Sequence, residues 1–101
     1  MIVISGYVDF QSSEEIERMQ ADGIKMVEAT REETGCIEYG FALDMLNPCR
    51  MRIYETWADQ AALDAHMASP HMAVFNGVIA SAKLAGASVL AYPASEPKKL
   101  I

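Results

Sequence analysis

The chain has 101 residues, of which 51% are hydrophobic and 22% are charged, a profile typical of one compact globular domain. Its formal net charge of −6, with eight scattered Lys and Arg residues, argues against nucleic acid or an anionic membrane as a partner. Because a chain this short buries only about two-thirds of its surface on folding, we expect a second copy to cover spare apolar surface.

The first ten residues predict a strand. From Ile2 to Phe10, β-branched and aromatic residues alternate with other types. No basic run precedes this stretch, and Gly6 and Asp9 interrupt it, so we expect neither a signal peptide nor a membrane span. A cytoplasmic location is therefore expected.

A long helix is predicted after this strand. Ser12-x-x-Glu15 has the spacing of a capping box, which marks a helix start. Apolar residues then recur at helical intervals until Gly35, which is expected to end the helix.

A hairpin is predicted next. The alternating stretches 36–44 and 49–57 flank the turn signal Asn47-Pro48, so we expect two antiparallel strands. Cys36 and Cys49 would lie at opposite ends of this hairpin, too far apart for a disulfide. Both are expected to be reduced thiols.

Two helices are predicted after the hairpin. Asp59 is expected to cap a short helix that runs through Met67, and Ser69-Pro70 supplies the N-cap and first residue of another. The second helix carries one continuous apolar stripe that starts at His71.

The last strand is predicted at residues 88–92, after Gly86 ends the helical region. The resulting order is β-α-β-β-α-β with the second helix in two pieces. This order predicts a ferredoxin-like α+β fold, with a four-stranded antiparallel sheet and helices on one face. Residues 1–93 would form the domain, and residues 94–101 a C-terminal tail.

Pairing the hairpin about Asn47-Pro48 assigns its side chains to two faces. One face is large and aromatic with two arginines and suits a sheet-to-sheet homodimer interface; it holds Ile37, Tyr39, Phe41, Leu43, Arg50, Arg52, Tyr54 and Thr56. The opposite face holds Cys36, Glu38, Gly40, Ala42, Met51, Ile53, Glu55 and Trp57. On this second face the small Gly40 and Ala42 leave room for a cavity beneath the helices.

The chain's single tryptophan and both histidines fall within residues 54–71. Trp57 ends a strand, and His66 and His71 lie on the apolar sides of the two helices that follow. We therefore expect these three rings to converge at one end of the fold, which makes this end the first place to seek a functional site.

These segments resemble a known family. The runs G-C-I-E-Y at 35–39, Y-E-T-W at 54–57, A-L-D-A-H at 62–66 and S-P-H at 69–71, with the Asn47-Pro48 turn, are similar to the antibiotic biosynthesis monooxygenase domain. The resemblance covers nearly the whole chain. It implies a dimeric α+β barrel, in which two ferredoxin-like domains pair their sheets. It also implies a cofactor-independent monooxygenase, because some members oxidise quinols or anthrones with dioxygen and without metal or flavin.

Such an oxygenase needs a phenol or quinol whose anion can pass an electron to dioxygen, a dry pocket and a base near neutral pKa. The candidate bases are His66, His71 and Glu55, and Glu38 beside Glu55 would raise its pKa. Trp57 is the expected stacking wall for a small aromatic substrate. The other expected substrate-binding residues are Met51, Ile53 and Phe75.

Metal catalysis is not favoured by the spacing. His66 and His71 are five residues apart across a helix break, unlike the i, i+4 pair that presents two ligands on one helix face. A facial triad with Glu55 is the metal arrangement that stays open. Haem degradation in relatives uses an asparagine on the first strand, a tryptophan and an axial histidine. Trp57 and His66 approximate the last two, but the first strand has Ser5-Gly6-Tyr7, so haem degradation stays a less favoured alternative. We therefore expect no metal and no cofactor.

Other interpretations of the same residues stay open. The cavity could hold an aromatic metabolite without turnover, or host isomerase chemistry on a lactone or sugar. Each side chain also has a purely structural interpretation: Trp57 as core, the histidines as rings bonded to backbone, and Glu55 as a carboxylate paired with a backbone amide or with Arg52.

Overall fold

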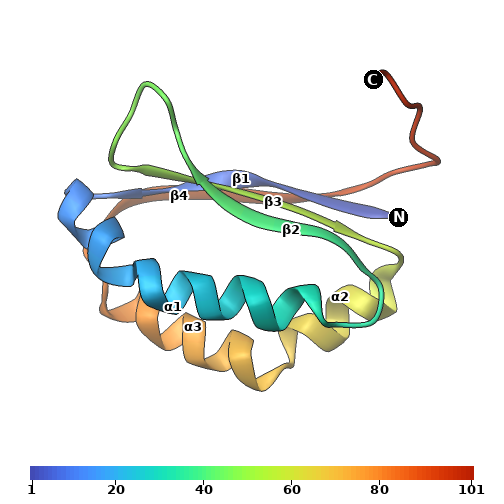
Figure 1. The fold of residues 1–101 in the computed structure, drawn as a ribbon, viewed down its shortest axis with the longest axis horizontal. Helices are drawn as coiled ribbons and strands as arrows, with labels where there is room; N and C mark the ends of the chain where they lie inside the picture. The colour runs from blue at the N-terminus through green and yellow to red at the C-terminus, as the bar shows by residue number, and fades with distance from the viewer.

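The computed structural model describes residues 1–101 and contains one four-stranded antiparallel sheet. The elements are β1 (Ile2–Phe10), α1 (Ser13–Arg31), β2 (Cys36–Leu43), β3 (Arg50–Trp57), α2 (Gln60–Met67), α3 (Pro70–Ser81) and β4 (Leu84–Pro93). The strand order is β2-β3-β1-β4, and all three helices cover one face of the sheet (Figure 1). The predicted ferredoxin-like α+β fold is confirmed.

The short helices begin where their caps predict. The Asp59 carboxylate accepts a hydrogen bond from the Ala62 amide at 2.8 Å, and the Ser69 hydroxyl accepts one from the Met72 amide at 3.2 Å. Pro70 occupies the first turn of α3, where its missing N–H removes no helical hydrogen bond. These starts could be predicted because each cap needs only residues that are adjacent in sequence.

The predicted capping box of α1 is wrong. The Ser12 side chain makes no capping hydrogen bond. Glu15 is instead buried, and its carboxylate pairs with Arg18 one turn later at 3.2 Å. The Glu15 side chain is therefore turned along the helix, away from the Ser12 amide that a capping box requires.

The hairpin register differs from the prediction by one residue. Tyr39 pairs with Glu55 and Phe41 with Ile53, and the Asp44 amide closes the hairpin by donating to the Arg50 carbonyl at 3.0 Å. Five residues thus form the loop, whereas the prediction centred the pairing on Asn47-Pro48. A slip of one residue moves every side chain of a strand to the other face.

This one-residue difference in register places most side chains of β2 on the face opposite to the predicted one. Tyr39 is only 3% exposed and, with Phe41, packs under the helices instead of joining an outer interface. Gly40 and Ala42 pair with Tyr54 and Arg52, and neither lines the cavity between the sheet and helices α2 and α3. An irregularity between Cys36 and Glu38 leaves Ile37 exposed but keeps Cys36 opposite Trp57. The predicted faces of β3 are correct.

The last strand begins earlier than predicted. β4 starts at Leu84, so Gly86 lies within the strand and does not end the helical region. Helix α3 ends at Ser81, where Ala82 adopts an extended backbone. The pairing of β4 with β1 along their lengths extends this strand, and such a long-range pairing is not visible in local sequence punctuation.

The outer face of the sheet carries no helix (Figure 1). Arg50 forms a two-point ion pair with Asp9 at 2.7 and 2.8 Å and lies 3.8 Å over the Tyr7 ring. Large apolar residues nearby, including Tyr54 and Leu90, are about half exposed. The homodimer expected through this face stays a prediction.

None of the three helices combines the length and the hydropathy that a membrane-spanning helix needs. Both cysteines are free, as the distance argument predicts.

Gly35 shapes the entry into β2. Its φ is +84°, and a Cβ there would lie 2.5 Å from the Ala62 Cβ of α2. Its carbonyl also accepts a hydrogen bond from the Ala58 amide at 2.8 Å. The turn between α1 and β2 is therefore fixed against the start of α2 by a residue without a side chain.

Replacing Gly35 by Ala is expected to lower the free energy of unfolding by at least about 1–2 kcal/mol, the cost of a left-handed backbone for a residue with a Cβ. The matched control is Gly77→Ala in α3, where a Cβ would meet nothing within 4 Å. It is expected to raise stability by about 0.5–1 kcal/mol. Urea denaturation measures both, and equal effects of the two substitutions would contradict the tight turn.

Candidate functional site

A cavity of about 480 Å³ lies between the sheet and helices α2 and α3. We call it the sheet-helix cavity. Fourteen of its eighteen lining residues are hydrophobic, so a bound molecule would contact mainly apolar side chains. The predicted substrate-binding residues Met51, Ile53 and Phe75 all line it, and so does Glu55. Trp57, His66 and His71 do not line it.

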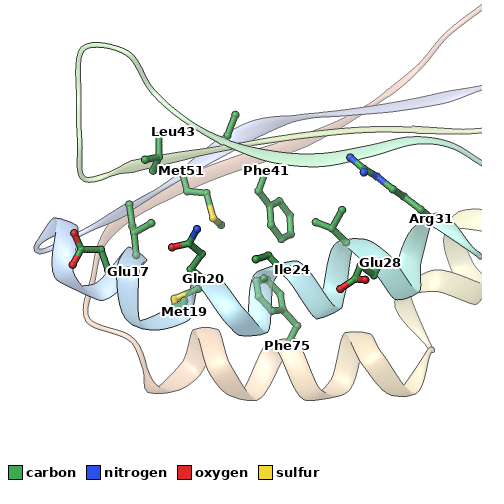
Figure 2. A pocket seen from close by; sticks show the side chains of 14 residues that line it. Glu17, Met19, Gln20, Ile24, Glu28, Arg31, Phe41, Leu43, Met51 and Phe75 are labelled. Atoms are coloured by element: carbon green, nitrogen blue, oxygen red, sulfur yellow. The ribbon is translucent and has the colours of Figure 1, made fainter.

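A second hollow of similar volume, here called the α1 groove, lies between α1 and the edge strand β2 (Figure 2). Phe41 of β2 and Phe75 of α3 border both hollows, and their rings stack with centroids 5.4 Å apart. The groove's charged residues come mainly from the exposed side of α1. Sequence reasoning missed this groove because it depends on where α1 crosses β2.

Glu55 is the buried acid of the sheet-helix cavity. It is 7% exposed, and the Trp57 indole N–H donates to its Oε1 at 2.9 Å. The two side chains can meet because residues two apart on a strand share a face. Trp57 is itself 0% exposed, so it fixes the carboxylate and offers no open stacking surface.

The environment of Glu55 favours its neutral form. Burial raises the pKa of this carboxyl, while the hydrogen bond from Trp57 and the proximity of His66 oppose the rise. Glu33 adds a smaller contribution that also raises the pKa. The predicted neighbour, Glu38, lies on the outer face because of the register change. A carboxyl whose pKa is shifted upward is a candidate general base.

Tyr39 faces Glu55 across the strand pair. Burial and the Glu55 charge raise the pKa of its phenol above the usual range, so the phenol stays protonated. The Thr30 hydroxyl lies close enough to oppose this rise, although it is fully buried and forms no hydrogen bond of regular geometry. Tyr39 also lines the cavity.

Both histidines contact Glu33. Its Oε2 lies 2.6 Å from Nδ1 of His66 and 2.8 Å from Nε2 of His71. We call these residues the Glu33 triad. His66 is 1% exposed, and its ring packs 4.7 Å from Trp57 between centroids. Trp57 thus contacts the triad through the His66 ring and Glu55 through its indole N–H.

Similarity to known proteins identifies the family to which the chain belongs. Residues 23–77, more than half of the chain, match the sequence profile of the antibiotic biosynthesis monooxygenases. The chain belongs to this family. The resemblance predicted from the sequence motifs is thereby confirmed.

Structures related to this antibiotic biosynthesis monooxygenase domain span nearly its whole length. A protein of Deinococcus radiodurans, provisionally named for the same family, is 24% identical over 100% of this chain and 99% of its own, with a TM-score of 0.89, which at this identity shows the fold alone. A second antibiotic biosynthesis monooxygenase is 28% identical, covers 95% of this chain and 100% of its own, and has a TM-score of 0.82.

A relative of the domain in Synechocystis sp., itself uncharacterized, is 31% identical over 74 residues. These residues are 73% of this chain and 50% of the relative, so the chain spans about half the length of the curated relative it matches.

The sequence did not indicate Glu33, the inward face of Tyr39, or the hydrogen bond that the Trp57 indole donates to Glu55. Glu33 stands in the run R-E-E-T-G, where the pattern does not distinguish it from Glu32. Tyr39 was misplaced with the rest of β2 by the register error. A correct pairing of Tyr39 with Glu55 would have found the phenol and carboxylate together.

Replacing Glu55 by Gln tests whether burial raises the pKa of this carboxyl in the folded protein. The folded pKa lies above the ordinary value of 4.5, so the folded protein holds this proton more tightly than the unfolded chain does. The stabilisation that comes from binding this proton is fully present below pH 4.5, the ordinary pKa of the group. It is lost as the pH rises through the pKa of Glu55 in the folded protein. The free energy of unfolding of the wild type should therefore fall, relative to Glu55→Gln, between acidic and neutral pH.

Urea denaturation across this pH range measures the difference. Glu38→Gln is the matched control, because Glu38 is exposed on the outer face, and its difference from the wild type should stay nearly constant. A wild type that gains stability over Glu55→Gln as the pH rises would rule out a raised pKa.

Proposed function

We propose that this protein is a small monooxygenase that oxidises a phenol, quinol or anthrone-like aromatic with dioxygen in the sheet-helix cavity. The observation that carries this proposal is one buried carboxyl, Glu55, in an otherwise mainly apolar cavity. Membership of the monooxygenase family supports the reaction type, and a 28%-identical relative bears the monooxygenase name.

Glu55 is the base in this proposal. Of the three candidate bases, it alone lines the cavity, whereas His66 and His71 are bonded to Glu33. Its Oε1 accepts from the Trp57 indole, which leaves Oε2 without a side-chain donor and available to the substrate. Burial raises the pKa of Glu55, and this strengthens it as an acceptor of a phenolic proton.

The reaction needs no reductant besides the substrate. Glu55 removes the acidic proton, and the substrate anion passes one electron to dioxygen. The resulting substrate radical and superoxide combine at a ring carbon to form a peroxide. Loss of the hydrogen on this carbon then breaks the O–O bond, so one oxygen atom stays as a carbonyl. The other leaves as water, with its second proton returned by Glu55.

Two further residues support this chemistry. The protonated Tyr39 phenol lies opposite Glu55 and can donate a hydrogen bond to a substrate oxygen. The mainly apolar walls would contact the aromatic ring and limit the water around the radical pair once a substrate fills the cavity. The predicted wall Trp57 acts indirectly here, since it holds Glu55 in place.

Oxygen uptake by the purified chain tests the proposal. Chelator-treated protein is mixed with a panel of hydroquinones and anthrones, and the rate is compared with autoxidation. Glu55→Gln is expected to lower kcat by about 10²–10⁴-fold, the usual contribution of a general base. In the wild type, kcat should rise with pH through the Glu55 pKa, above its ordinary value of 4.5, because only the carboxylate accepts a proton.

The control is Glu38→Gln, which should retain the wild-type rate because its side chain lies on the opposite face. Tight binding of the aromatics without oxygen uptake would contradict the monooxygenase proposal and would indicate a binding module for an aromatic metabolite. Turnover without oxygen would indicate isomerase chemistry instead.

A further inference from the structure

We propose that Glu33, His66 and His71 bind one divalent first-row transition-metal ion. None of the three residues lines the sheet-helix cavity, so the proposal goes beyond the monooxygenase function and does not depend on it. The three side chains come from three segments: the turn after α1, the last turn of α2 and the first turn of α3.

The donor atoms already converge. Oε2 of Glu33, Nδ1 of His66 and Nε2 of His71 all lie within 4.8 Å of one another. Bonds of about 2.0–2.2 Å to one tetrahedral ion would place these atoms roughly 3.3–3.6 Å apart. The two nitrogen to oxygen distances are now 2.6 and 2.8 Å, so a small rotation of the Glu33 carboxylate makes room.

His66 and His71 converge in three dimensions although they are five residues apart across a helix break. The break between α2 and α3 turns the chain, and Ser69 fixes it by accepting from the Met72 amide and donating to the His66 carbonyl at 2.7 Å. The two histidines also present different ring nitrogens, Nδ1 and Nε2. Residues five apart therefore reach one point without the i, i+4 geometry of a single helix.

The donor set selects the class of ion. Two imidazoles and one carboxylate suit Zn²⁺, Fe²⁺ and similar ions, whereas Mg²⁺ and Ca²⁺ prefer oxygen ligands alone. The His71 and Glu33 side chains keep 25% and 16% of their surface exposed, which gives an ion a route in from solvent. Three protein ligands leave at least one coordination position for water.

The surroundings hold the ligands in place. The His66 ring is packed between Trp57 and Tyr39, with centroids 4.7 and 5.4 Å away. Gly35 turns the chain sharply two residues after Glu33. Ligands that are fixed before binding lose little conformational freedom when the ion enters.

Calorimetric titration of the chelator-treated full chain with Zn²⁺ tests the site. One equivalent should bind, and the melting temperature should rise as Zn²⁺ is added. Glu33→Gln and His71→Ala should each weaken binding at least tenfold. Glu32→Gln is the matched control, because it removes the neighbouring exposed carboxylate and should bind as the wild type does.

A second readout follows the His66 ring. A neutral His66 that donates from Nδ1 to Glu33 must carry its proton on Nε2 once Nδ1 binds an ion. Nitrogen NMR of the imidazoles at slightly alkaline pH should show this change of tautomer with Zn²⁺. Mg²⁺ at the same concentration should leave the spectrum unchanged.

Binding of less than one equivalent, or equal Zn²⁺ affinity in the wild type and Glu33→Gln, would overturn the proposal. Glu33→Gln decides the matter if His71→Ala does not fold, because Gln keeps the shape of the side chain. Oxygen uptake is measured separately on metal-free protein, so failure of the metal site and failure of the monooxygenase are distinguishable.

Discussion

The hydrogen bond from the Trp57 indole to the Glu55 carboxylate is the interaction on which the site depends. A carboxylate buried in an apolar cavity is costly unless it is hydrogen-bonded, and the indole N–H is its one side-chain donor. Trp57 can supply this donor because it is fully buried and cannot rotate away. The bond leaves Glu55 able to ionise while burial keeps its pKa raised, and general base chemistry requires both conditions.

The aromatic rings around Trp57 link two sites of different character. On one side, Tyr39 and Glu55 face the mainly apolar cavity. On the other side, the His66 ring packs on Trp57 and is bonded to Glu33, next to the more exposed His71. The two sites are also linked electrostatically, because the proximity of His66 opposes the rise of the Glu55 pKa.

Local signals in the sequence predicted much of the fold correctly. The features that depend on pairing between distant residues were not predicted correctly. The caps at Asp59 and Ser69 depend on neighbours in sequence, so they were predicted correctly. The side-chain face of β2 depends on the length of the hairpin loop, and one residue of error placed Tyr39 on the wrong side. Glu33 meets His66 across 33 positions, and the sequence pattern around Glu33 gives no sign of this partner. The sequence thus indicated the three rings and Glu55 as members of a candidate site, which stays a prediction, and it did not indicate Glu33 or the inward face of Tyr39.

The most direct measurement is a crystal structure with a bound phenol that resembles a quinol but resists oxidation. We expect its ring in the sheet-helix cavity, next to Phe41 and Phe75, with the phenolic oxygen within hydrogen-bond distance of Glu55. The Trp57 to Glu55 hydrogen bond should persist in the complex. A ring bound in the α1 groove, or in the cavity without contact to Glu55, would contradict the role of Glu55 as the base.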